Sequence, residues 1–86
     1  MAKITEVDRL IAERDALTDD KLRMLHREHR ESPYVKYPLT ETAFARTYRR
    51  FLNVEIAAWV ALESGDQDAY FKWDRESQRL CGMMGY

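Results

Sequence analysis

The chain has 86 residues, of which 45% are hydrophobic and 34% are charged, and its formal net charge at pH 7 is −1. This length and hydrophobic content predict one globular domain over residues 1–86 and exclude an intrinsically disordered protein. The sequence has neither an uncharged apolar run of about 18 residues nor the apolar segment of a signal peptide, so we expect no membrane insertion. A single cysteine, Cys81, leaves no internal disulfide and favours the reducing cytoplasm.

The charges are unevenly distributed along the chain. Residues 1–20 carry three basic and six acidic side chains, residues 21–50 eight and three, and residues 51–86 three and six, which gives net charges of −3, +5 and −3. A basic middle segment can attract an acidic partner. It can equally be neutralised within the fold when the acidic flanks pack against it, and the sequence leaves both interpretations open.

Two helices are predicted in the first part of the chain. The first spans about residues 5–16, where Thr5 and Asp8 have the spacing of a capping box. The second spans about residues 18–31 and must end before Pro33, which cannot continue a helix. Apolar residues fall on one side of each, so both are expected to lie on another element.

His26 and His29 lie three residues apart on the apolar face of the second helix. Two imidazoles with this spacing can share a metal ion, but a protein site needs three or four ligands, and Cys81 is the one other soft candidate. We therefore predict no metal site and no cofactor. The preferred interpretation is a pair of hydrogen-bonded structural histidines.

A connector with the sequence SPYVKYP, residues 32–38, lies between two prolines and is expected to be extended. Its apolar residues Tyr34, Val35 and Tyr37 allow two interpretations. Either they attach the connector to the core, or the tyrosines remain partly exposed on a loop.

The longest helix is predicted over residues 40–64, with Thr40 as its N-cap and Gly65 at its C-terminal stop. The second half of this helix is apolar nearly all round, so it needs cover on more than one side, from the chain itself or from a second copy. At 100° per residue, one stripe contains Phe44, Tyr48, Phe51, Glu55, Trp59 and Leu62.

A last helix is predicted over residues 66–81, with Gly82 ending it and Leu80 on its core side. The short link through Gly65 makes the last two helices an antiparallel hairpin. The sequence therefore predicts an all-α fold: a small four-helix bundle around the long third helix.

No catalytic motif is recognisable. Glu55 lies among apolar residues of the long helix without a partner carboxylate, and we interpret it as paired with an arginine of another helix or exposed by a tilt of the stripe. Cys81 has no evident activating base and is interpreted as a small apolar residue at a helix end. We expect no enzyme activity.

Arginines and aromatics form the most suggestive set. Aromatic residues, Met and Arg are enriched at the cores of protein interfaces. We therefore expect a protein–protein interaction module, an adaptor or inhibitor with an acidic partner or a second copy of itself; small chains of this kind are often encoded by phages and other mobile elements. The partner-binding candidates are Arg23, Arg27, Arg30, Arg46, Arg49, Arg50, Tyr34, Tyr37 and Phe71.

The alternative is a DNA- or RNA-binding protein that uses the basic segment 21–50. The stretch from Phe44 through Trp59 to Gly65 resembles a helix-turn-helix, with its turn at residues 49–53. A continuous helix accounts for the same residues. The sequence pI of about 6.1 is also low for a nucleic-acid-binding domain.

Overall fold

The computed structural model describes residues 5–86, and within them the chain folds into helices joined by short links. The elements are α1 (Glu6–Asp15), α2 (Asp19–Glu31), α3 (Glu41–Ser64) and α4 (Gln67–Met84). The predicted all-α fold around a long third helix is confirmed. Residues 1–4, which the prediction of one domain includes, lie outside the described residues.

Side chains immediately before the helices cap their N-termini. Thr5, Thr18, Thr40 and Asp66 each accept a hydrogen bond from the backbone N–H three residues further on. At α1 the carboxylate of Asp8 also accepts from the N–H of Thr5, so the predicted capping box is present. Caps of this kind contribute about 1 kcal/mol each, which fixes where each helix begins.

The end of α4 differs from the prediction. We expected a stop at Gly82, but the helix continues to Met84, and Gly85 takes the left-handed C-cap conformation with φ 78°. A glycine inside a helix costs about 1 kcal/mol relative to alanine. Met84 is fully buried, and burying a methionine side chain contributes about 1.5–3 kcal/mol, which offsets that cost.

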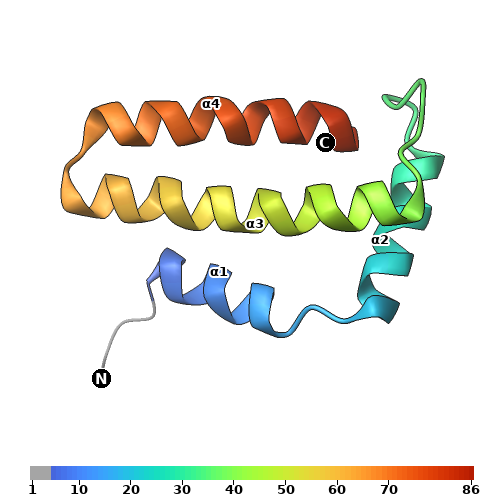
Figure 1. Cartoon of the computed structure of the whole chain (residues 1–86), viewed down its shortest axis with the longest axis horizontal. Coiled ribbons are helices and arrows are strands. Elements are labelled where there is room, and N and C mark those ends of the chain that lie inside the picture. Colours follow the sequence, from blue (N-terminus) through green and yellow to red (C-terminus); the bar gives the residue numbers. More distant parts are fainter. Residues whose placement is uncertain (1–4) are drawn as a thin grey trace.

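α1, α3 and α4 lie side by side, with α3 in the middle, and α2 crosses the N-terminal end of α3 (Figure 1). The molecule is flat, with extents of 38 × 29 × 19 Å. The link at Gly65, with φ 79°, turns the chain so that α3 and α4 form the predicted antiparallel hairpin. α3 is therefore covered by different helices on its two sides.

The core lies along the contacts of α3 with α1 and of α3 with α4. Leu52, outside the predicted stripe, is 1% exposed, whereas Leu62, inside it, is 44% exposed. Phe44 and Tyr48 of the predicted stripe are buried, but burial is not confined to that stripe, because α1 and α4 pack against different sides of α3. The central cluster consists of Leu10, Leu22, Phe44, Tyr48, Leu52 and Met84.

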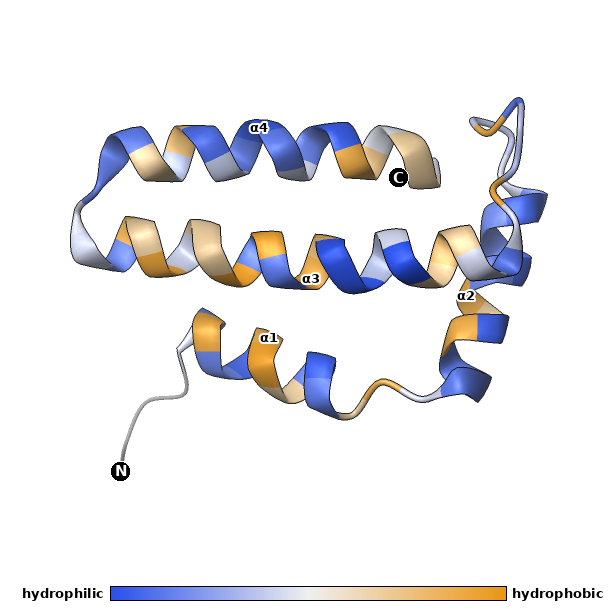
Figure 2. Ribbon diagram, viewed as in Figure 1, coloured by the Kyte–Doolittle hydropathy of each residue, from blue (hydrophilic) through white to orange (hydrophobic). Residues whose placement is uncertain are grey.

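Most of the hydrophobic residues of α3 lie in its second half (Figure 2). Ala58 and Ala61 are buried there, while Val60 remains 49% exposed. α3 is one continuous helix through residues 49–53, so the turn required by a helix-turn-helix is absent from this stretch. None of the helices within residues 5–86 combines the length and the hydropathy needed to span a membrane.

Candidate functional site

The connector of residues 32–38 continues through Leu39 and Thr40 to the start of α3, and the two histidines bind this whole connector, residues 32–40, at Leu39. The backbone N–H of Leu39 donates to Nε2 of His29 over 2.8 Å, so this nitrogen carries no hydrogen. His29 is therefore the Nδ1–H tautomer, and this N–H donates to the carbonyl oxygen of Met84 over 2.9 Å. Nε2 of His26 donates to the carbonyl oxygen of Leu39 over 2.8 Å. We call this set of hydrogen bonds the histidine clamp.

The histidine clamp lies in the core. His29 is 1% exposed, and its ring centroid is 5.0 Å from that of Phe44. Both imidazoles are occupied by backbone groups, as the structural interpretation predicts. Within residues 5–86, no three His, Cys, Asp or Glu side chains come together in a way that could hold a metal ion.

Val35 and Ser32, rather than the tyrosines, attach the rest of the connector. The Val35 side chain lies so close to Gly85 that a Cβ there would overlap its Cγ2 atom. The Ser32 hydroxyl donates to the Gly85 carbonyl oxygen over 3.5 Å. Tyr34 and Tyr37 are 85% and 82% exposed, so the first interpretation of the connector holds for Val35 and the second for the two tyrosines.

A shallow hollow of about 290 Å³ lies between the connector and the end of α4, and its lining includes Tyr34, Tyr37, Gly82 and Met83. We call this surface the connector ledge. Lys36 lies over the ring of Tyr37, with Nζ 5.7 Å from the centroid. The ledge therefore presents two aromatic side chains and a cation on a loop that is attached to His29 and to Gly85.

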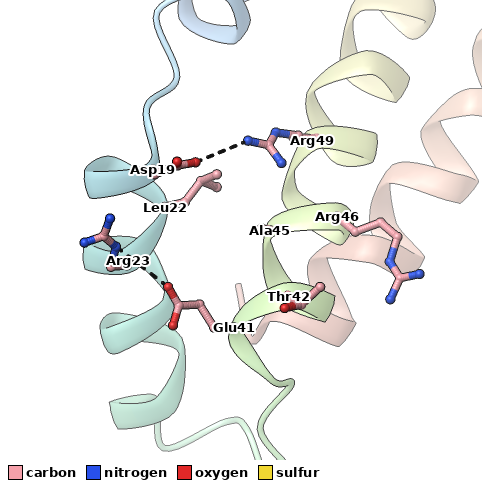
Figure 3. Close-up of a pocket in the computed structure, with 8 residues that line it drawn as sticks. All are labelled: Asp19, Leu22, Arg23, Glu41, Thr42, Ala45, Arg46 and Arg49. Carbon is pink, nitrogen blue, oxygen red and sulfur yellow. Dashed lines mark ion pairs between the residues drawn. The ribbon is translucent and has the colours of Figure 1, made fainter.

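Three of the candidate arginines line a groove of about 540 Å³ between α2 and α3. Arg23 lies 3.8 Å from Glu41, and Arg49 lies 3.8 Å from Asp19, whereas Arg46 points away from α2 (Figure 3). The basic segment is thus partly neutralised within the fold. Arg27 and Arg30 are exposed on α2.

Arg50 and Phe71 meet at a larger hollow of about 890 Å³ beside α4, here called the α3–α4 hollow. In its wall, Glu76 accepts hydrogen bonds from Arg79 (3.0 Å) and Arg50 (3.3 Å). The hydrogen bond from Arg79, together with that from Arg50, lowers the pKa of Glu76 from 4.5 to about 2. This carboxylate therefore holds one guanidinium from each helix.

Sequence reasoning missed three further cations of this hollow, Lys72, Arg75 and Arg79. Their spacings of three and four residues place them on one face of α4, and this periodicity was the signal that could have identified them. Lys72 lies over the ring of Trp73, with Nζ 5.3 Å from its centroid.

The polar groups in the seam between α3 and α4 are also paired. The Ser77 hydroxyl donates to Glu55, so the arginine partner predicted for Glu55 was wrong. Burial, and then the charge of Glu55, raise the pKa of the Cys81 thiol, and a hydrogen bond with Ser77 acts in the opposite direction. A thiol with a raised pKa is a poor nucleophile at neutral pH.

The predicted partner-binding residues thus fall on separate surfaces rather than on one. Tyr34 and Tyr37 lie on the connector ledge, while Arg50 and Phe71 lie at the α3–α4 hollow. The remaining five are arginines that lie on α2 or along the α2–α3 groove. No protein-family model, no curated protein and no solved structure matches this chain.

Proposed function

We propose that this chain is a non-enzymatic protein–protein interaction module, an adaptor or inhibitor, and that the connector ledge is its main contact surface. One observation carries the proposal. Tyr34 and Tyr37 are 85% and 82% exposed on a connector whose base is attached by a partly buried hydrogen bond from Leu39 to the buried side chain of His29.

The physical argument is preorganisation. Ordering a loop on binding costs conformational entropy, and a loop that is already fixed avoids most of that cost. Tyrosine gives a large contact area with few rotatable bonds. Met83, 40% exposed at the edge of the ledge, adds a residue type that is enriched in interface cores.

The remaining reactive groups support binding rather than catalysis. Glu55 bonds Ser77, while His26 and His29 bond backbone groups, so none of these three is directed at a shared open pocket. The raised pKa of Cys81 disfavours the thiolate.

The alternative function, nucleic-acid binding through residues 21–50, has less support. Arg23, Arg49 and Arg50 each form an ion pair with a carboxylate of the chain, which reduces the charge available to phosphates. This alternative predicts retention on heparin that weakens steeply with salt.

The test is an affinity capture from lysate of the source cell treated with nuclease. A partner that binds the wild-type chain should be lost with the double variant Tyr34→Ser/Tyr37→Ser. It should be retained by Val60→Ser, a matched control because Val60 is half-exposed on α3, away from the ledge.

Two outcomes contradict the proposal. If the double variant captured the partner at the wild-type level, the connector ledge would be excluded as the contact surface. Capture that disappears on nuclease treatment would favour the nucleic-acid alternative. Static light scattering on the purified chain tests self-association separately, because a dimer that dissociates in the double variant would identify a second copy as the partner.

A further inference from the structure

We propose that the α3–α4 hollow is a second docking surface, which takes an acidic peptide segment of a partner protein together with one apolar side chain of that segment. This inference does not rest on the connector ledge. It rests on the charge of the hollow, on the way its cations are held and on its exposed aromatic ring.

The charge of the hollow is positive although the chain as a whole is slightly negative. Four cations and two carboxylates, Asp68 and Glu76, line it, which gives a net charge of +2. Lys72 and Arg75 form no ion pair with a carboxylate of residues 5–86. A segment rich in Asp and Glu is attracted to such a surface, and complementary charge raises the rate of association.

Two of the cations are positioned in advance. Glu76 binds Arg50 from α3 and Arg79 from α4, so both guanidinium groups are held at the rim of the hollow. Each side chain remains 57% exposed and keeps N–H donors free for an incoming carboxylate. Holding these long side chains in place lowers the entropy that binding costs.

An apolar anchor is available beside the charges. Phe71 is 60% exposed, and its ring lies tilted against the ring of Tyr70, with the two centroids 5.7 Å apart. Trp73 also lines the hollow. Because aromatic and arginine side chains together are typical of interface cores, an acidic segment with one apolar residue fits this surface better than a purely acidic one.

The experiment is an NMR titration of the full-length ¹⁵N-labelled chain with the peptide acetyl-DEEDEFEEDE-amide, which has one apolar residue. We expect shift changes at the indole N–H of Trp73 and at the amides of residues 71–79, which weaken as salt is raised. Arg75→Glu and Phe71→Ser should each weaken binding by roughly tenfold. Lys21→Glu and Met24→Ser alter exposed residues of α2 that are not partner-binding candidates, and both should leave peptide binding unchanged.

Several outcomes would overturn the proposal. They are an absence of shifts at α4, equal binding by Arg75→Glu, and equal binding of a peptide in which lysines replace the acidic residues. Stronger shifts at the same amides with single-stranded oligo(dT) would indicate a nucleic acid instead. Shifts that grow with protein concentration alone would indicate a second copy. The variant Tyr34→Ser/Tyr37→Ser should still bind the peptide, which separates this test from that of the connector ledge.

Discussion

Nδ1–H of His29 donates a hydrogen bond to the carbonyl oxygen of Met84, a residue 55 positions further along the chain. The other ring nitrogen of His29 accepts from the N–H of Leu39. One buried imidazole therefore joins α2, the connector and the last turn of α4. The connector ledge depends on His29, although neither Tyr34 nor Tyr37 forms a hydrogen bond with this histidine.

Replacing His29 should be costly. His29→Ala removes one buried and one partly buried hydrogen bond and leaves a cavity, so we expect the free energy of unfolding to fall by about 2–4 kcal/mol. His26→Ala, which removes one partly buried hydrogen bond, should cost about 1 kcal/mol. Urea unfolding followed by tryptophan fluorescence measures both. Equal losses in the two variants would contradict the central role of His29.

The glycines provide a graded test of the fold. Gly85→Ala should destabilise most, because φ is 78° and a Cβ would overlap Val35. Gly65→Ala, with φ 79° and open space around it, should cost about 1–2 kcal/mol. Gly82→Ala should stabilise the protein by about 0.5–1 kcal/mol, because Gly82 is helical and nothing lies near its Cβ position.

Thermal unfolding of the three glycine variants gives their order directly. If Gly82→Ala destabilised the protein, the continuation of α4 past residue 81 would be contradicted.

Glu76 should make the free energy of unfolding depend on pH in the acidic range. Its pKa is about 2 in the folded chain against an ordinary value of 4.5, because Arg79 and Arg50 donate to the carboxylate. A lowered pKa means that its stabilising contribution is complete above pH 4.5 and disappears as the pH falls towards 2. Glu76→Gln should therefore be less stable than the wild type at pH 7, with the difference closing across this interval.

Urea unfolding at several pH values measures the difference between the wild type and Glu76→Gln. A difference that stays constant from neutral pH to pH 2 would mean that the two arginines do not stabilise the ionised form.

Cys81 should react slowly with a thiol reagent in the folded state. Its pKa is raised by burial and by the charge of Glu55, so the thiolate is scarce at neutral pH. Glu55→Gln removes that charge while keeping a hydrogen-bond acceptor for Ser77, and the reaction should become faster at a given pH. The rate of reaction with Ellman's reagent between pH 7 and 9 measures this, and an unchanged rate would contradict the influence of Glu55.

Local sequence signals identified the helices well because they act over a few residues. Thr5, Thr18 and Thr40 cap helices where the sequence places them, since a cap needs only the N–H three residues further on. The end of α4 was missed for the opposite reason. Whether the helix passes Gly82 depends on burial of Met84 against a histidine from α2, which no local pattern contains.

The candidate surfaces were predictable in their residue types but not in their grouping. Arg49 and Arg50 are neighbours in sequence, yet one lies beside Asp19 of α2 and the other beside Glu76 of α4. Successive residues on a helix point about 100° apart, so adjacent arginines reach different partners. That division appears only when the helices on the two sides of α3 are placed.

The position of α1 at the edge of the flat arrangement has a consequence for hydrogen exchange. Leu10 is its one buried residue, and its polar links to α3 are Tyr48 donating to Glu13 (3.3 Å) and Arg14 donating to Asn53 (3.2 Å). A helix attached by so few contacts opens at a lower free energy than the global unfolding transition. The amides of α1 should therefore exchange through a separate local opening that leaves the α3–α4 hairpin intact. During each such opening, the side of α3 that carries Tyr48 and Asn53 becomes transiently accessible to solvent.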